Sequence, residues 1–302
     1  MIRLAALLLM AGAARADVAA ITSQNAGMLT LVQTENLEIV ASTPLPGKPA
    51  AVALDAARGR VMAVAVETAR LHVFDLAGNP LSDLPVAGAP FGLAIRPDTG
   101  TALVTDQAGA LLREIDPATG RQLAQWPTGA LPSGVAEGGG WIVVANRDGD
   151  TVTVIRGDAA QEIAVGHHPF GVTLLGARAF VTDVLSDQVS VIDLAGGRVI
   201  ANIPTGERPY ATAFAAGRGF VTNQYDASLT VFDEESLKVV ARIETDDYPE
   251  GIAASSEGQI LVANWFSDTV QVIDPVSMQV VETLDMPEGP RAFGAFTGAK
   301  AP

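Results

Sequence analysis

Residues 206–233, GERPYATAFAAGRGFVTNQYDASLTVFD, contain the pattern that decides the fold. They open on a Gly-x-x-Pro turn, pass through a Phe-Val-Thr-Asn step, and end in an alternating apolar and polar run that stops at Asp233. Alternation with a period of two is typical of a half-buried β-strand, and glycine and proline between such runs mark turns. The stretch therefore predicts a unit of short antiparallel strands.

This unit recurs along the chain at a spacing of about forty residues. The prolines of successive turns are separated by 41, 42, 37, 40, 40 and 41 residues. They are Pro49, Pro90, Pro132, Pro169, Pro209, Pro249 and Pro290. The Asn or Asp that ends the second strand, and the Asp that ends the third, mostly recur in step with them. Four antiparallel strands cannot bury both faces of their sheet alone, so the copies must pack against one another around an axis.

The two ends of the chain determine how the ring closes. Six complete units fill the middle, three strands are expected before them at residues 18–23, 28–33 and 39–44, and one after them at residues 291–296. Together these make a seventh blade, and sharing it between the ends hides two strand edges. The sequence thus predicts an all-β, seven-bladed β-propeller with four antiparallel strands per blade and a last blade closed by the N-terminal strands.

The first residues have the features of an export signal. Arg3 supplies a positive charge, residues 4–10 are an unbroken apolar run, and residues 14–16 (Ala-Arg-Ala) offer a small-x-small cleavage pattern. We expect residues 1–16 to be a signal peptide, residues 17–302 to form one propeller domain, and the mature protein to be periplasmic.

Composition excludes several kinds of site. The chain has no cysteine, which rules out disulfides, thiolate metal sites and covalent c-type haem attachment. Its formal net charge of −15 repels nucleic acid and anionic lipid headgroups, and it favours a cationic partner or a basic protein surface. We expect no nucleic acid among its partners and no membrane anchor.

Three segments carry a family resemblance. The turn at residues 206–209, the Phe-Val-Thr-Asn step at 220–223 and the strand at 229–233 resemble the YVTN-family β-propeller repeat, and the resemblance covers nearly all of the expected mature chain. The first copies depart from it, with Val66 and Gln24 where asparagine is usual. The resemblance implies the propeller fold and leaves function open, because these residues serve turns and strand packing. Proteins with similar repeats include periplasmic binding proteins, amine dehydrogenase subunits and accessory proteins of haem or quinone pathways.

One face of the ring is expected to bind ligands. The Gly-x-x-Pro turns and the loops after the second strands should lie on the same face, around the mouth of the central channel. The variable residues there are the candidates for a ligand or partner site: His167, His168, Arg208, Tyr210, Asp246, Asp247, Tyr248, Trp265, Phe266 and Arg291.

Each group of candidates has two interpretations. Tyr248, Trp265 and Phe266 form either an aromatic docking patch or a contact between blades 6 and 7. His167 or His168 is a weak candidate for a metal ligand, because adjacent residues in a strand-like segment point in opposite directions. The carboxylates at residues 246 and 247 either hold a hard cation or are solvated.

Catalysis finds little support in the sequence. The chain has three histidines, no Gly-x-Ser-x-Gly elbow, no His-Glu-x-x-His helix and no phosphate-binding glycine loop. We therefore expect a non-catalytic binding or scaffold protein that holds a protein partner or small ligand, without a cofactor. The alternative is an accessory protein or subunit of a periplasmic redox system that depends on haem or quinone. There, haem or a metal ion would be bound, and His167 or His168 is the first residue to test. A lactonase or other hydrolase is the least favoured class.

Overall fold

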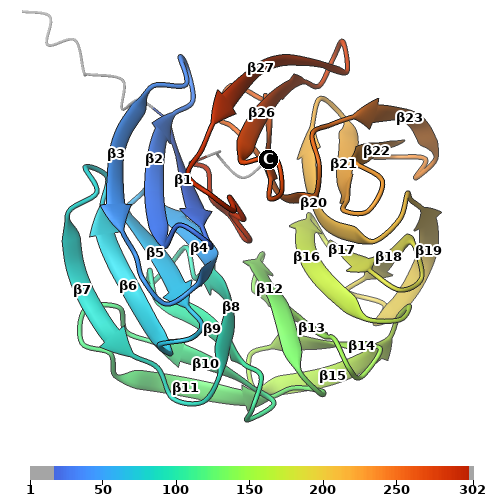
Figure 1. Cartoon of the computed structure of the whole chain (residues 1–302). Helices are drawn as coiled ribbons and strands as arrows, with labels where there is room; N and C mark the ends of the chain where they lie inside the picture. The colour runs from blue at the N-terminus through green and yellow to red at the C-terminus, as the bar shows by residue number, and fades with distance from the viewer. Residues whose placement is uncertain (1–16, 299–302) are drawn as a thin grey trace, which may run out of the picture.

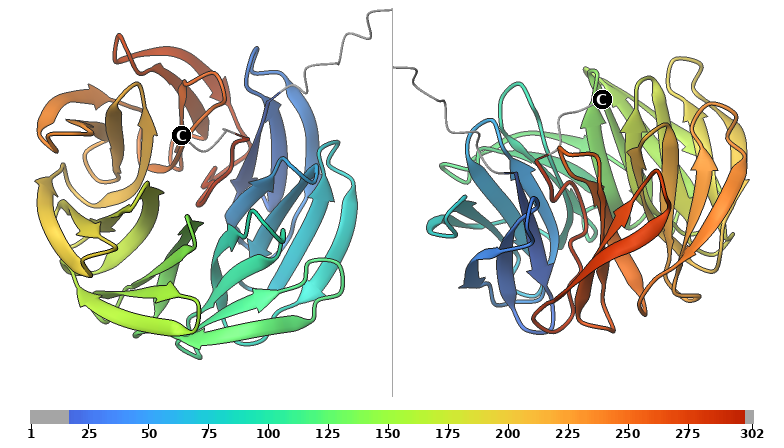
Figure 2. Two further views of the ribbon diagram at one scale, coloured as in Figure 1. Left: turned by 180° about the vertical axis from the view of Figure 1, so that it is seen from behind. Right: turned by 90° about the horizontal axis from the view of Figure 1, so that it is seen from above.

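The computed structural model describes residues 17–298 and arranges seven small antiparallel sheets in a ring (Figure 1). In each sheet the strands are paired in chain order, and the first strands of adjacent blades contact each other around the axis. The views from behind and from above show the blades side by side around the axis (Figure 2). The predicted seven-bladed β-propeller is confirmed. The predicted signal peptide, residues 1–16, lies outside the described residues.

Six blades have four regular strands each. Blade 1 contains β4 (Pro49–Asp55), β5 (Arg60–Ala65), β6 (Arg70–Asp75) and β7 (Pro80–Pro85). Blade 2 contains β8 (Pro90–Ile95), β9 (Ala102–Asp106), β10 (Leu111–Ile115) and β11 (Gln122–Pro127). Blade 3 contains β12 (Pro132–Gly138), β13 (Trp141–Asn146), β14 (Thr151–Arg156) and β15 (Ala159–Ala164).

The second half of the ring repeats this plan. Blade 4 contains β16 (Pro169–Leu175), β17 (Arg178–Asp183), β18 (Gln188–Asp193) and β19 (Arg198–Pro204). Blade 5 contains β20 (Pro209–Ala215), β21 (Arg218–Asn223), β22 (Ser228–Asp233) and β23 (Val239–Glu244). Blade 6 contains β24 (Pro249–Ala254), β25 (Ile260–Asn264), β26 (Thr269–Asp274) and β27 (Gln279–Asp285). Within residues 17–298, no helix is long and apolar enough to cross a membrane.

The glycine and the Asn or Asp of the repeat occur together because they pack against each other. In blade 5 the Asn223 amide donates to Ser228 Oγ at 2.9 Å and to Thr230 Oγ1 at 3.0 Å, and its Oδ1 accepts from Gly206 N at 3.2 Å. A Cβ atom on Gly206 would lie 2.9 Å from the Asn223 amide. Glycine at this position therefore leaves room in blade 5 for the asparagine that ties the Gly-x-x-Pro turn to the second and third strands.

The threonine of the repeat joins neighbouring blades. Thr222 Oγ1 donates to the Glu250 carbonyl at 2.9 Å, and Thr182 Oγ1 donates to the Tyr210 carbonyl at 2.9 Å. Each of these bonds runs from the second strand of one blade to the innermost strand of the next. The sequence step that predicts a strand end thus also holds the ring together at its inner edge.

Blade 7 is shared between the two ends, as expected. It contains β1 (Val18–Ser23), β2 (Met28–Gln33) and β3 (Ile39–Pro44), with the bounds that the sequence predicts. The segment at residues 290–297, which we call the closing segment, occupies its innermost position next to β1 (Figure 1). Arg291 N donates to Thr22 O at 2.7 Å, and Ala20 N donates to Phe296 O at 2.7 Å.

The closing segment is not the regular strand that was predicted for residues 291–296. It forms isolated bridges to β1 at its two ends, and between them it turns toward blade 1, where Val52 N donates to Phe293 O at 2.9 Å. Ala292 has a φ of 45° and Gly294 a φ of 123°, which interrupt the extended conformation. The segment therefore bonds to both blade 7 and blade 1.

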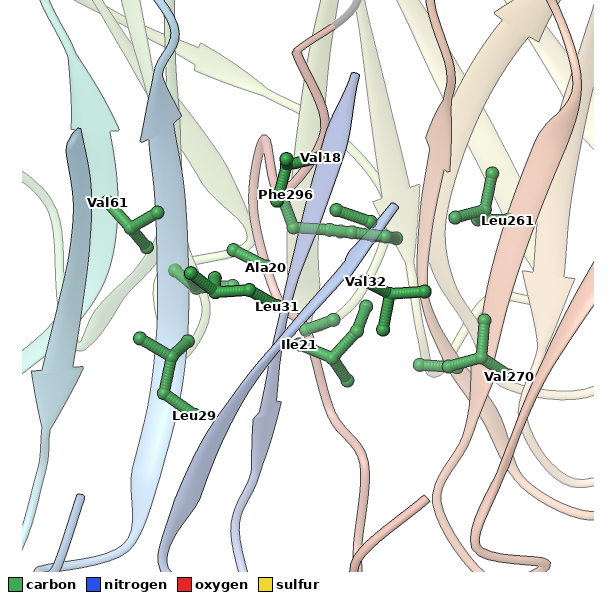
Figure 3. Close-up of a cluster of buried hydrophobic side chains, with 14 of the residues drawn as sticks. Val18, Ala20, Ile21, Leu29, Leu31, Val32, Val61, Leu261, Val270 and Phe296 are labelled. Atoms are coloured by element: carbon green, nitrogen blue, oxygen red, sulfur yellow. The ribbon is translucent and has the colours of Figure 1, made fainter. Parts of the chain in front are cut away.

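The core of blade 7 lies between its two neighbours (Figure 3). Ile21 and Leu31 pack with Val61 of blade 1 on one side and Leu261 of blade 6 on the other, and Phe296 of the closing segment is fully buried among them. Burial of apolar surface contributes about 25 cal/mol per Å², so this cluster stabilises the joint where the ring closes.

Candidate functional site

The two kinds of turn that were expected on one face of the ring do lie together. Val184 N donates to His168 O at 3.1 Å, Gln224 N donates to Arg208 O at 3.0 Å, and Trp265 N donates to Tyr248 O at 2.9 Å. Each bond joins the loop after a second strand to the Gly-x-x-Pro turn of the same blade. We call the surface formed by these turns the proline face.

Large side chains close the ring axis at the proline face. The residues that directly follow Pro90, Pro169 and Pro209 are aromatic, and their rings meet Phe293 of the closing segment. The ring centroid of Phe170 lies 4.4 Å from that of Tyr210, 5.0 Å from that of Phe293 and 5.7 Å from that of Phe91. We call these four rings, with Glu250 and Arg291, the axial plug.

An ion pair completes the axial plug. Arg291 Nε lies 3.1 Å from Glu250 Oε2 and donates to Tyr210 Oη at 3.0 Å, while Arg291 Nη1 donates to Gln24 Oε1 at 3.1 Å. Gln224 Nε2 donates to Glu250 Oε1 at 2.6 Å. Burial raises the pKa of the Glu250 carboxyl, and the guanidinium of Arg291 opposes this. The candidates Tyr210 and Arg291 are thus brought together, but as parts of a packed plug.

Four aromatic side chains, two exposed and two half-buried, gather at blades 5 and 6. The ring centroid of Tyr248 lies 5.3 Å from that of Tyr225, 5.9 Å from that of Trp265 and 4.8 Å from that of Phe266. The Cζ atom of Arg208 lies over the ring of Tyr225, 5.4 Å from its centroid. Tyr225 is 56% exposed and Phe266 63%. We call these five residues the aromatic patch. Its rings pack on each other over blades 5 and 6.

A shallow hollow adjoins the aromatic patch. It is lined by Leu185, Asp187, Glu207, Arg208 and Tyr225, and Leu185 is 51% exposed. Arg208 and Tyr225 therefore belong both to the patch and to a hollow with two carboxylates. Tyr225 and Leu185 complete a surface of which the sequence named Arg208, Tyr248, Trp265 and Phe266. Both lie in loops after second strands, where the residues of this face were expected.

His167 and His168 lie in a turn and not in the strand-like segment that was assumed. His168 has a left-handed φ of 58°, and β16 begins at the next residue. Both residues contact one carboxylate, since His167 Nδ1 lies 2.7 Å from Asp150 Oδ2 and His168 N donates to Asp150 Oδ1 at 2.8 Å. Burial lowers the pKa of the His168 imidazole, and Arg147 lowers it further.

The two adjacent aspartates form hydrogen bonds that hold their turn. Asp246 Oδ2 accepts from Thr269 Oγ1 at 2.7 Å, and the backbone N–H of Asp247 donates to Ser267 Oγ at 2.9 Å. Across the part of the chain that the structure describes, no three His, Cys, Asp or Glu side chains gather as a metal site would need. The structure thus separates the ten candidates into a plug, a patch, a histidine turn and an aspartate turn.

The central channel forms a cavity of about 340 Å³ behind the axial plug. Phe293 lines it on the plug side, and its wall consists mostly of small and aliphatic residues of the innermost strands. In β16 the first three residues are buried and Val172–Leu175 are half-buried, so the channel opens toward the face opposite the plug. The channel mouth expected on the proline face is closed there, because three blades place an aromatic ring directly after the proline.

Comparison with known proteins supports the fold. No protein-family model matches the chain, and no curated protein matches it. A functionally unknown protein from Desulfotomaculum acetoxidans DSM 771 has a similar structure, with a TM-score of 0.76 at 15% identity, covering 92% of this chain and 100% of that one.

Two similar structures belong to enzymes. Virginiamycin B lyase from Staphylococcus aureus has a TM-score of 0.70 at 16% identity and covers 82% of this chain and 92% of its own. The dihydro-heme d1 dehydrogenase NirN has a TM-score of 0.66 at 16% identity and covers 89% of this chain and 63% of its own. At such identities the likeness shows the β-propeller fold alone.

Proposed function

We propose that this protein is a periplasmic propeller of the YVTN type that acts as a non-catalytic scaffold and holds a protein partner on its proline face. The aromatic patch is the observation that carries the proposal. Large exposed aromatic side chains that adjoin one another mark interaction surfaces, and tyrosine, tryptophan and arginine dominate the binding energy of such surfaces.

The repeat itself does not require these residues. At the position of Tyr225, two residues after the Asn or Asp, the other units carry different side chains, such as Asp148 in blade 3 and Leu185 in blade 4. Tyr225 and Phe266 are largely exposed, so they add little to the folding of the ring. Their exposure is explained if a second protein covers them.

Charge indicates the kind of partner. The chain has a formal net charge of −15, and Asp187 and Glu207 border the aromatic patch in the adjoining hollow. A partner surface with lysine or arginine around an apolar centre would match this arrangement, and such charge complementarity raises association rates and specificity. We therefore propose a basic protein surface as the partner of the patch.

The test compares two double variants in the native host. Tyr225→Ala with Phe266→Ala removes the exposed rings of the patch, and Leu81→Ala with Val276→Ala removes two exposed apolar side chains elsewhere on the ring. The first pair should abolish co-purification of a stoichiometric partner from the periplasm, while the second should leave it intact. The partner is then purified and its binding measured directly, with weaker binding expected at high salt. Equal recovery of the partner by both variants would refute the patch as the docking surface.

The proposed periplasmic location is tested by measuring the mass of the exported protein. If residues 1–16 are a signal peptide, the protein recovered from the periplasm begins at Asp17. A full-length N-terminus, or recovery from the cytoplasm alone, would contradict the periplasmic part of the proposal and leave the docking surface unaffected.

A role in a periplasmic redox system is the second candidate, prompted by the likeness to a structure described as a dihydro-heme d1 dehydrogenase. In that case protein purified from its native host carries a visible absorption band, and His167→Ala or His168→Ala diminishes it. A colourless preparation that binds a stoichiometric partner through the aromatic patch supports the scaffold.

A further inference from the structure

The channel cavity has the dimensions of a small-molecule site. Its volume of about 340 Å³ lies at the lower end of the roughly 300–1,000 Å³ of ligand pockets. Leu93, Val135, Val172, Ala213 and Ile252 are among the apolar side chains of its wall, and Phe293 lies at the plugged end. A wall of this kind receives an apolar body, and the plug fixes how far that body can enter.

One charged side chain interrupts the apolar wall. Glu137 contributes the single titratable group among the residues that line the cavity. It lies near the end of β12, where it pairs with Ile142, so it is far along the strand from Pro132 and close to the open end of the channel. A carboxylate at the mouth of an apolar channel gives the site a polar end and a non-polar end.

Glu137 lacks a partner of its own within the described protein. Its Oε2 atom is buried and has no hydrogen-bond partner. Arg96 is the nearby cation, but no hydrogen bond or ion pair joins it to Glu137: its Nη1 donates to Glu114 Oε2 at 3.1 Å, and its Nε, which has no hydrogen-bond partner, lies 4.0 Å from Asp98 Oδ1. Burial raises the pKa of the Glu137 carboxyl, which Arg96 partly opposes. A buried polar atom left unpaired is unfavourable, so a ligand that donates a hydrogen bond to it gains affinity.

We propose that the channel binds a small lipophilic ammonium ion, with its apolar body between the innermost strands and its N–H group donating to Glu137. The charge of the whole protein and the carboxylate at the mouth both favour a cation over an anion or a neutral molecule. A single carboxylate is too few ligands for a metal ion, which leaves an organic cation as the matching chemistry.

This site is independent of the proposed docking surface. The aromatic patch lies on the proline face, and the channel opens on the other face behind the axial plug. Loss of partner docking would therefore leave ligand binding in the channel unchanged, and the reverse also holds.

Three probes with the same phenyl ring and two-carbon chain test the assignment by titration calorimetry. They are 2-phenylethylamine, 2-phenylethanol and phenylacetate, which carry a cationic, a neutral and an anionic group. We expect the amine to bind most tightly and phenylacetate most weakly. Glu137→Gln should weaken binding of the amine by about tenfold or more, as expected for loss of a charge-assisted hydrogen bond, and should leave 2-phenylethanol little changed.

Two further variants control for place and for non-specific charge. Ala295→Trp puts a large side chain at an exposed position of the channel wall and should abolish binding of all three probes. Glu162→Gln removes an exposed carboxylate from the outer strand β15 and should have no effect. Thermal melts of each variant show that the fold is retained. The proposal is overturned if wild-type protein does not bind the amine, if the three probes bind equally, or if Glu137→Gln binds the amine as wild type does.

Discussion

Arg291 directly follows the last of the seven repeat prolines, and its guanidinium lies in the axial plug between Glu250 and Tyr210. The corresponding residue in the other units is an alanine, a serine, an aromatic residue or Glu250. The same backbone position therefore supplies aromatic rings from three blades and an ion pair from blades 6 and 7. The aromatic rings and the ion pair together close the ring axis at the proline face, and they separate this face from the central channel.

Arg291→Ala should reduce the free energy of unfolding by about 3–5 kcal/mol, because it leaves the buried Glu250 carboxylate without its charge partner. Arg291→Met combined with Glu250→Leu removes both charges and should recover most of the loss. Urea denaturation of the wild type and the two variants measures the difference. If the single variant is as stable as the double variant, the ion pair does not hold the plug together.

At the scale of the element, the innermost strands approach one another closely enough to restrict the second residue after each proline. A Cβ atom on Gly171 would lie 2.4 Å from the Tyr210 carbonyl oxygen of the next blade. The residue two positions after each proline is a glycine or an alanine in all seven copies. Small residues there let the blades meet at the axis and let the threonine bonds between blades form.

Gly171→Ala should destabilise the ring by about 1–3 kcal/mol, as expected for forcing an atom into a packed site. Gly138→Ala is the matched control, because the nearest atom to its new Cβ lies 3.6 Å away and its φ is not positive. The control should be neutral or slightly stabilising. Thermal melts of both variants decide this, and equal melting temperatures would contradict the proposed contact between blades.

The elements were predictable to the extent that their signals are local and repeated. The bounds of β1, β2 and β3 follow from turn residues and alternation, which recur in most copies. The closing segment has a positive φ at Ala292, which no local pattern indicates, and so its irregular path could not be foreseen. The axial plug and the place of Glu137 depend on which side chains meet across the ring, and a repeat pattern holds no information on that.

At the scale of the whole molecule, the ring depends on the joint between its two ends. Phe296 of the closing segment is fully buried between blades 1, 6 and 7. Next to it, Thr297 Oγ1 donates to the Ala254 carbonyl of blade 6 at 2.5 Å. No other blade of the described protein is assembled from segments so far apart in sequence. Truncating a side chain in this joint should therefore lower the free energy of unfolding more than truncating an equally large side chain on the surface.

Phe296→Ala should cost about 3–5 kcal/mol, the usual loss for truncating a buried phenylalanine. Phe266→Ala removes the same side chain from a position that is 63% exposed and should change stability by less than about 0.5 kcal/mol. Both are measured by urea denaturation. A Phe296→Ala variant as stable as Phe266→Ala would show that the joint does not limit the stability of the ring.

The closing segment also sets an order of events during synthesis. Ala292 N donates to Thr22 Oγ1, 270 residues earlier in the chain, so β1 lacks its inner neighbour until residue 292 has been synthesised. Until then the inner edge of β1 is unpaired and the axis at the proline face is open. A chain that lacks the closing segment therefore presents a free strand edge to other chains, and addition of this segment protects the protein from self-association.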